Sequence, residues 1–255
     1  MEMQDTVRMS TEYLGGGVSL YVSQNHKFGT DAVLLSDFAL PKGAKKPEFA
    51  CDMGSGCGII PMLWFGRGVA AQKTYGVEIQ HEGVELMRLT AAKNNIEDRF
   101  FPIEADLTAL TSEQLPMGKF QLVTCNPPYK PEGTGIKSSA DAAVIARHEG
   151  SCDIFSVCAA AKRLLRFSGR FCICLRPERL VDAMCAMREN SLEPKRLRFV
   201  RQRAATEPWL FLLEGRRGGN PGLRIETDII MEGENGPSDE VKRIYSQFYE
   251  EREKD

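Results

Sequence analysis

The glycine-rich segment at 48–61 constrains the fold of this 255-residue chain more than any other feature. Its sequence is E-F-A-C-D-M-G-S-G-C-G-I-I-P, in which a short apolar run precedes Asp52 and the glycines Gly54, Gly56 and Gly58. Apolar residues resume at once after the glycines, which is typical of a buried helix face. A strand, a glycine turn and a helix in this order form the crevice in which an open α/β sheet binds a ligand.

The glycine spacing and the neighbouring acid indicate which ligands suit the loop. The pattern is G-x-G-x-G, not the G-x-G-x-x-G of dinucleotide binding, and it lacks the G-K-[ST] ending of a phosphate loop. Asp52 would repel a phosphate, whereas it suits a ligand that carries an ammonium group or other donors. For the loop taken alone, a glycine-rich turn without a ligand is the alternative.

Later segments place more polar residues at the ends of expected strands. Residues 74–79 form the next expected strand, in which Glu78 follows the glycine loop by about twenty residues, where an acid can accept hydrogen bonds from ribose hydroxyls. Residues 99–106 are expected to form a third strand that ends at Asp106. Residues 120–129, F-Q-L-V-T-C-N-P-P-Y, are an apolar strand that runs into N-P-P-Y.

Together these residues resemble the class I S-adenosylmethionine-dependent methyltransferases, in the branch that modifies amino or amide nitrogens. The likeness covers roughly residues 28–175, and N-P-P-Y is its most specific part. Two further segments narrow the family that the chain resembles: F-G-T-D-A-V-L-L at 28–35 and L-G-G-G-V-S-L-Y-V at 14–22. With them, the chain resembles the bacterial adenine-N6 methyltransferases that modify valine tRNA beside its anticodon.

The resemblance implies a Rossmann-like α/β fold with a mostly parallel seven-stranded sheet and an antiparallel edge hairpin. We expect a hairpin extension at 1–27, a methyltransferase domain at 28–236 and a C-terminal helix or tail at 237–255. Strands at 196–200 and 209–213, followed by a turn at 216–222, fit the edge hairpin. A helix after Phe28 is expected to take Thr30 or Asp31 as its N-cap.

The implied cofactor is S-adenosylmethionine, which becomes S-adenosylhomocysteine. By the same resemblance, Asp106 would bind the adenine amino group of the cofactor, although a solvated strand-end acid is an equal alternative. The full set of residues expected to bind the cofactor is Gly29, Thr30, Asp31, Asp52, Gly54, Gly56, Gly58, Glu78, Ile79, Asp106, Leu107 and Asn126.

The N-P-P-Y residues Asn126, Pro127, Pro128 and Tyr129 are expected to carry the reaction. The side-chain carbonyl of Asn126 and the backbone carbonyl of Pro127 can accept the N–H groups of a target amine. Tyr129 offers a flat face to a base. An asparagine is neutral, so we expect no strong general base, and the proton is lost to water after the transfer.

A tRNA partner would require cations that contact its phosphates. The net charge of the chain is -2, so any such surface must be local. A solvated strand face is the alternative for a run of charges. The candidate cations are Lys130, Lys137, Arg196, Arg198, Arg201, Arg203, Arg216 and Arg217.

The remaining features exclude other classes. No apolar run is long enough to span a bilayer, and the first residues lack the apolar core of a signal peptide. The eight cysteines include no C-x-x-C pair and no zinc-finger spacing with histidine. We therefore expect buried free thiols in a reducing cytoplasm, no metal and no membrane. A monomer is assumed.

Other functions compete with the tRNA interpretation. A glutamine-N5 methyltransferase of release factors also uses N-P-P-Y, but it carries a helical N-terminal domain where this chain has hairpin character. A DNA adenine methyltransferase needs a target-recognition domain for which the chain leaves no room. A non-catalytic RNA-binding protein with the same fold is the alternative from another class, and the intact acids, glycines and N-P-P-Y argue against it.

Overall fold

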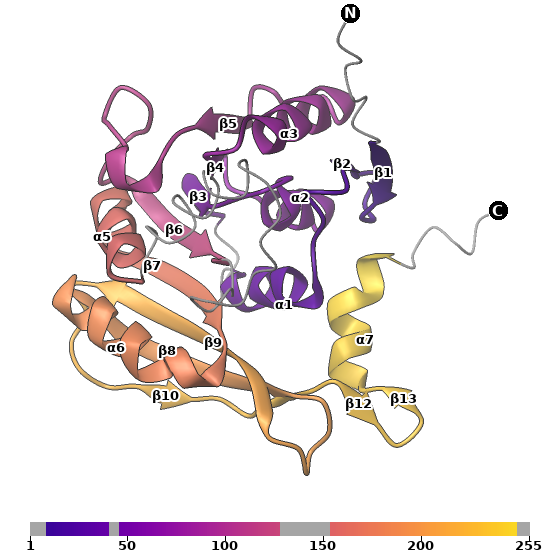
Figure 1. The fold of residues 1–255 in the computed structure, drawn as a ribbon, viewed down its shortest axis with the longest axis vertical. Helices are drawn as coiled ribbons and strands as arrows, with labels where there is room; N and C mark the ends of the chain where they lie inside the picture. The colour runs from indigo at the N-terminus through magenta and orange to yellow at the C-terminus, as the bar shows by residue number, and fades with distance from the viewer. Residues whose placement is uncertain (1–8, 41–45, 128–153, 249–255) are drawn as a thin grey trace, which may run out of the picture.

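The computed structural model describes residues 9–40, 46–127 and 154–248 (Figure 1). Its centre is a nine-stranded sheet in the order β10-β8-β9-β7-β6-β3-β4-β5, with β11 also paired to β8. The strands of this sheet are β3 Phe49–Met53, β4 Lys73–Glu78, β5 Phe100–Glu104, β6 Phe120–Cys125, β7 Leu165–Leu175, β8 Leu192–Arg201, β9 Pro208–Arg217, β10 Arg224–Ile225 and β11 Ile229–Ile230.

Helices cover both faces of this sheet (Figure 1). Helices α1, α2 and α3 pack in one buried cluster, while α5 and α6 belong to a second cluster on the other face. The helices are α1 Thr30–Ala39, α2 Ile59–Gly66, α3 His81–Lys93, α5 Ile154–Leu164, α6 Leu180–Glu189 and α7 Asp239–Tyr245, with 3-10 turns η1 Leu107–Ala109, η2 Pro177–Arg179 and η3 Ser246–Phe248. The three-layer α/β fold confirms the expected class.

The order of the sheet confirms the parallel core and corrects its edge. Strands β5, β4, β3, β6 and β7 run parallel, and β9 is antiparallel to both β7 and β8. The expected seven strands are present, but β10 and β11 each add two residues parallel to β8. They lie outside β8, so the hairpin of β8 and β9 is not the outer edge at this end of the sheet.

Strand β9 is longer than the sequence predicted. We expected a turn at 216–222, but Arg216 pairs with Arg170 and Glu193, and Arg217 pairs with Leu192. Both arginines are therefore strand residues. The turn begins only at Gly218, whose φ of 65° is favourable for glycine.

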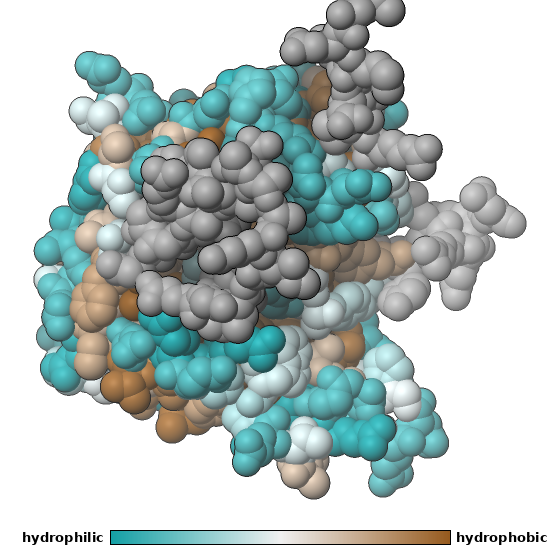
Figure 2. Space-filling model, in the orientation of Figure 1, coloured by the Kyte–Doolittle hydropathy of each residue, from teal (hydrophilic) through white to brown (hydrophobic). Residues whose placement is uncertain are grey.

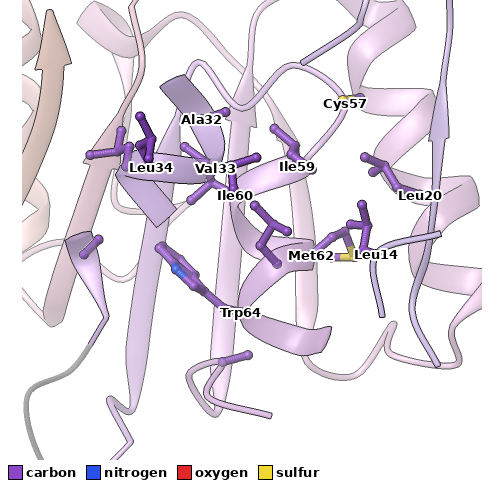
Figure 3. Close-up of a cluster of buried hydrophobic side chains, with 14 of the residues drawn as sticks. Leu14, Leu20, Ala32, Val33, Leu34, Cys57, Ile59, Ile60, Met62 and Trp64 are labelled. Atoms are coloured by element: carbon purple, nitrogen blue, oxygen red, sulfur yellow. The ribbon is translucent and has the colours of Figure 1, made fainter. Parts of the chain in front are cut away.

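The N-terminal hairpin packs against the main domain and is hydrogen-bonded to it. Strands β1, Ser10–Tyr13, and β2, Ser19–Val22, form an antiparallel pair, and Leu14 and Leu20 are fully buried near Met62 of α2 (Figure 3). The Asn94 side chain accepts from Ser19 N at 2.9 Å and donates to Ser19 O at 2.7 Å. These bonds satisfy backbone groups of β2 and attach the hairpin to the end of α3.

The C-terminal helix α7 is joined to α1 by charge. Arg243 donates to both oxygens of Asp37 in α1 at 3.1 and 3.0 Å, and Arg67 donates to Asp37 at 2.7 Å. Val241 and Ile244 of α7 are buried in the same cluster as α1. The apolar side of α7 thus packs onto the body of the fold, and the expected C-terminal helix is present.

The visible surface is mostly hydrophilic, with a brown area at the lower left in the region of α6 and β10 (Figure 2). Val181 of α6 and Ile225 of β10 are exposed. None of the helices in the described ranges could cross a membrane on length and apolarity. Six of the described cysteines are buried, but Cys185 is exposed because it faces away from the sheet on α6, contrary to expectation.

Candidate functional site

The candidate site lies at the topological switch point of the sheet, where successive strands change from one side of β3 to the other. From β3 the chain proceeds outward to β4 and β5, whereas β6 lies on the other side of β3 and is followed by β7. Met53 pairs with Val77 on one side and with Cys125 on the other. The glycine loop, Glu78 and Asn126 therefore meet at the carboxyl ends of three adjacent parallel strands, which is where open α/β sheets bind ligands.

The glycine loop presents an open backbone surface. Gly54 and Gly56 have φ values of 64° and 56°, and a Cβ at either would meet nothing within 4 Å. Gly58, with φ 87°, is different, because its Cβ would lie 2.9 Å from Cγ of Met87 in α3. Two glycines thus give a ligand access to the main chain, and the third permits close packing of α2 against α3.

Asp52 lies beneath this loop and is 2% exposed. Ser55 Oγ donates to its Oδ2 at 2.8 Å, and Thr124 Oγ1 donates to its Oδ1 at 2.6 Å. Burial raises the pKa of Asp52 to about 7, the two hydroxyl bonds oppose the rise, and the charge of Glu78 adds to it. Asp52 therefore holds the loop from below and carries a carboxyl group that titrates near neutrality.

Glu78 holds the other side of the loop. Its Oε2 accepts from Gly56 N at 2.9 Å, and its Oε1 accepts from the backbone N–H of Ile79 at 2.9 Å and of Gln80 at 3.0 Å. A carboxylate has about four acceptor positions, so these described contacts leave one on Oε2. That position suits one donated hydroxyl proton. Ile79, which follows Glu78, is 43% exposed and offers an apolar surface beside it.

Asp106 is close to Glu78 but is partly engaged. Ala105 N donates to Glu78 O at 3.0 Å, which keeps the turn after β5 against the end of β4. Asp106 Oδ1 accepts from both the backbone N–H and the hydroxyl of Thr108 at 2.8 Å and caps η1. None of the described contacts uses Oδ2. Leu107, the first residue of η1, is half-buried beside it.

Asn126 follows β6 directly and its amide is held at both ends. Its Nδ2 donates to Asp31 Oδ2 at 3.1 Å, and its Oδ1 accepts from the thiol of Cys174 at 3.1 Å. Pro127 is half-buried next to Asn126. Pro128, Tyr129, Lys130 and Lys137 lie outside the described residues.

The start of α1 borders this site and corrects an expectation. The N-cap residue is Gly29 in an extended conformation with no side-chain cap, so neither Thr30 nor Asp31 caps the helix. Asp31 instead reaches Asn126, which is 95 positions later in the chain. A Cβ at Gly29 would lie 2.6 Å from Asp31 Oδ1, so glycine leaves room for this carboxylate.

Some cofactor candidates, such as Gly54 and Gly56, therefore face the open side of the candidate site. Others, such as Asp52 and Glu78, hydrogen-bond to the loop and hold it in place. The structure gathers all of them at one edge of the sheet, but Asp52 and Glu78 are largely occupied by the loop. Sequence reasoning missed Ser55, Thr124 and Cys174. Thr124 could have been found, because pairing β6 with β3 places it opposite Asp52; no sequence signal indicates Cys174.

The candidate arginines are mostly engaged in ion pairs within the protein. Arg196 is 7% exposed, stacks on the Phe38 ring at 3.7 Å and pairs with Glu214 at 2.9 Å. It is a core residue, so the expectation of RNA contact at this position is wrong. The side-chain partners of the other paired arginines are Glu240 for Arg198, Asp228 for Arg201 and Glu232 for Arg203.

The arginines also differ in which edge of the sheet they occupy. Arg201 ends β8 and Arg203 follows it, and β8 runs parallel to β7 because both are antiparallel to β9. These two lie at the carboxyl edge with Asn126. Arg216 is exposed and Arg217 donates to Leu165 O, both at the opposite end of β9. Among the described residues no His, Cys, Asp and Glu group could hold a metal.

Comparisons with known proteins agree with this geometry. The model of the methyltransferase small domain family matches residues 6–150. A tRNA1(Val) (adenine(37)-N6)-methyltransferase of Aeromonas hydrophila is 28% identical, with 88% of this chain and 90% of that protein covered. One of the same description from Phocaeicola vulgatus is 28% identical, with 73% and 75% covered. The fold matches the crystal structure of a predicted O-methyltransferase from Agrobacterium tumefaciens with a TM-score of 0.64 at 19% identity, covering 86% of this chain and 97% of that one.

Proposed function

Because this chain belongs to the methyltransferase small domain family, we propose that it methylates the exocyclic N6 of an adenine in tRNA, with S-adenosylmethionine as donor. The relatives named as tRNA1(Val) (adenine(37)-N6)-methyltransferases make the anticodon-loop adenine of valine tRNA the specific candidate. The observation that carries the proposal is Asn126, a neutral amide at the end of β6, beside a glycine loop that is open on one side.

The residues present fit the donor. Gly54 and Gly56 leave space that a Cβ would fill, so the backbone there can lie against a ligand. The remaining acceptor position of Glu78 suits a ribose hydroxyl, Ile79 provides an apolar face for a flat ring, and Asp106 Oδ2 suits an amino group. In its ionised form Asp52 would provide negative charge beneath the loop for an ammonium group, and a bound ammonium group would favour that form. When bound, S-adenosylmethionine would supply an electrophilic methyl group on its sulfonium.

The chain's own task is to position and desolvate the target amine. The lone pair of an exocyclic adenine nitrogen is delocalised into the ring, so it is a poor nucleophile. Asn126 Oδ1 and the carbonyl of Pro127 can accept its two N–H bonds and fix the nitrogen for attack, which is a contribution of orientation rather than of basicity. An amide is no base at neutral pH, so the proton is lost to water.

The target base must leave its stack to reach this position. An anticodon loop is already largely single-stranded, which lowers the free energy of that step. Phosphate contacts would come from the edge that carries Asn126. Arg203 is 72% exposed in its side chain, and its ion pair with Glu232 is of the exposed kind that contributes little. It can therefore exchange Glu232 for a phosphate, as can Arg201 to a lesser degree. A tRNA substrate and buried free cysteines support a cytoplasmic location.

The test is transfer of a labelled methyl group to an unmodified valine tRNA transcript, followed by nucleoside analysis. We expect label in N6-methyladenosine, and none when adenine 37 is replaced by guanine. Asn126→Ala should bind S-adenosylmethionine with unchanged affinity and lose at least 100-fold in kcat, on the order of one transition-state hydrogen-bond acceptor. Full activity of Asn126→Ala would remove the assigned role of the amide.

The same assay separates the alternatives. Label in a release-factor glutamine instead of tRNA would identify a protein methyltransferase, against which the N-terminal hairpin of β1 and β2 already argues. Binding of the transcript without transfer to any substrate would identify an RNA-binding protein that has lost the reaction.

A further inference from the structure

Three side chains from distant parts of the sequence meet at Asn126. Asp31 comes from the first turn of α1, Asn126 follows β6, and Cys174 is the second-last residue of β7. Asp31 Oδ2 and Asn126 Nδ2 are 3.1 Å apart, and Cys174 Sγ and Asn126 Oδ1 are also 3.1 Å apart. Cys174 is fully buried, while Asp31 and Asn126 are half-buried at the border of the site.

This arrangement decides which way the amide points. The terminal torsion of an asparagine is broad and roughly two-fold, so the side chain alone does not distinguish its oxygen from its nitrogen. An ionised carboxylate only accepts hydrogen bonds, so Asp31 must face the NH2 group. The oxygen then lies on the opposite side, where the Cys174 thiol donates to one of its two lone pairs. An amide oxygen can accept two hydrogen bonds, so a substrate N–H can approach the same oxygen that the thiol contacts.

Asp31 itself is held rigidly by the rest of α1. At the far end of the helix, Arg196 donates to Phe38 O at 2.5 Å and Arg170 donates to Ala39 O at 3.0 Å. Both guanidinium groups also bind Glu214 Oε2, at 2.9 and 3.0 Å. Cations at the carboxyl end of a helix satisfy its last carbonyls and stabilise its dipole. Helix α1 is therefore fixed to β7, β8 and β9, and its first turn has a defined position relative to β6.

We propose that Asp31 is a positioning residue, which orients the Asn126 amide so that its oxygen receives the target amine, and that Cys174 supports the same orientation from the other side. This inference rests on the proposed function, and it assigns Asp31 to the substrate side of the site rather than to the cofactor. Without Asp31 the amide can rotate and present its NH2 group, which repels an amine donor.

The expected effect is a loss in kcat with little change in cofactor affinity. For Asp31→Ala we expect kcat to fall about 10- to 100-fold while the Kd for S-adenosylmethionine changes less than 3-fold, because a hydrogen bond that acts only through orientation is lost. Asp31→Asn retains an acceptor oxygen and should recover much of the rate. Cys174→Ser keeps a donor and should be nearly as active as the unmutated enzyme, whereas Cys174→Ala should lose several-fold. Asp98→Ala, at an exposed carboxylate in the turn before β5, is the matched control.

A second readout needs no cofactor and no tRNA. The side-chain NH2 signals of Asn126 in a 15N-correlation spectrum can be identified by their absence in Asn126→Ala. In the unliganded protein we expect Asp31→Ala to shift these signals and to accelerate their hydrogen exchange, with Asp31→Asn intermediate and Asp98→Ala unchanged. This readout would move for a positioning contact and would stay still if Asp31 served only the cofactor.

The outcomes are separable. A large increase in the Kd for S-adenosylmethionine in Asp31→Ala at unchanged kcat would overturn the inference and make Asp31 a cofactor ligand. Unchanged Asn126 amide signals in Asp31→Ala, or unfolding of that variant together with unchanged signals in Asp31→Asn, would also overturn it. Absence of methyl transfer by the unmutated protein would instead refute the proposed function, and the amide signals would still show whether Asp31 fixes Asn126.

Discussion

The buried carboxyl group of Asp52 should make the stability of this protein fall as the pH rises from about 4 to about 7. Its pKa lies at about 7 in the folded protein and at the ordinary 3.8 when the chain is unfolded. The folded state therefore binds the proton more tightly, so Asp52 favours folding most at acid pH. That contribution declines from about pH 4 and is fully lost above about pH 7. This direction is opposite to that of a salt-bridged carboxylate.

The magnitude follows from the same two values. One pH unit corresponds to about 1.4 kcal/mol, so the whole difference is worth about 4 kcal/mol, and the part between pH 5 and pH 8 is about 3 kcal/mol. In Asp52→Asn the side chain keeps its size but no longer titrates. Its NH2 group can donate to the hydroxyl of Ser55 or Thr124, because a hydroxyl both donates and accepts.

The assay is denaturant unfolding of the unmutated protein and of Asp52→Asn at pH 5 and pH 8. Between pH 5 and pH 8 the free energy of unfolding of the unmutated protein should fall by about 3 kcal/mol more than that of the variant. In thermal unfolding this corresponds to a difference of roughly 6 to 12 °C in Tm. The comparison cancels His81, Glu82 and the other groups whose titration both proteins share. Equal pH dependence of the two proteins, or a larger loss in Asp52→Asn, would refute the account of Asp52 as a carboxylate made costly by burial.

Three further predictions concern the glycine loop and the arginines Arg196 and Arg203. Gly56→Ala should lower stability by about 1 kcal/mol because φ is 56°, and it should weaken the binding of S-adenosylmethionine at least 10-fold because the new Cβ occupies the open side of the loop. Gly118→Ala is the control, because it lies at φ 73° with open space in a turn before β6, carries the same strain and should leave binding unchanged. Equal affinity of the two variants for S-adenosylmethionine would contradict this use of the loop. Arg196→Met should destabilise the fold by about 3 kcal/mol, because the buried Glu214 loses one of its two described arginine partners and keeps only Arg170. Arg203→Ala should leave stability within about 0.5 kcal/mol and reduce the salt dependence of tRNA binding by about one phosphate contact. Arg216→Ala, an exposed arginine on the opposite edge, should leave that salt dependence unchanged, and a smaller slope in Arg216→Ala alone would place the RNA on the other edge.

Much of the site could be predicted because it depends on strand ends. Once the segments ending at Met53, Glu78 and Cys125 were taken as neighbouring parallel strands, the loop, the acid and Asn126 had to lie together. No side-chain contact was needed for that step. The same reasoning could not say what the acids bind, because Glu78 is bonded to backbone groups of its own turn.

The errors come from residues whose partners are remote in sequence. Asp31 has the side chain and the position that are typical of an N-cap. It instead accepts a hydrogen bond from the side chain of Asn126, 95 residues later in the chain. Arg196 alternates with Leu197 along β8 as an exposed arginine would. It is buried because α1 covers that face of the sheet and because β9 places Glu214 opposite it. These contacts depend on the order of the strands in the sheet, which no local sequence pattern predicts.

The contact between Asp31 and Asn126 also explains why an amide rather than an acid stands at the end of β6. A carboxylate at 126 would be a better base, but it would lie about 3 Å from the Asp31 carboxylate, where two like charges cannot both stay ionised at neutral pH. One of them would take a proton, and the orientation of both groups would then depend on pH. An asparagine avoids this conflict, because its NH2 group satisfies Asp31 while its oxygen keeps a constant direction and charge. The neutral residue is thus fixed by its neighbour in α1 as much as by the chemistry of a weakly nucleophilic amine.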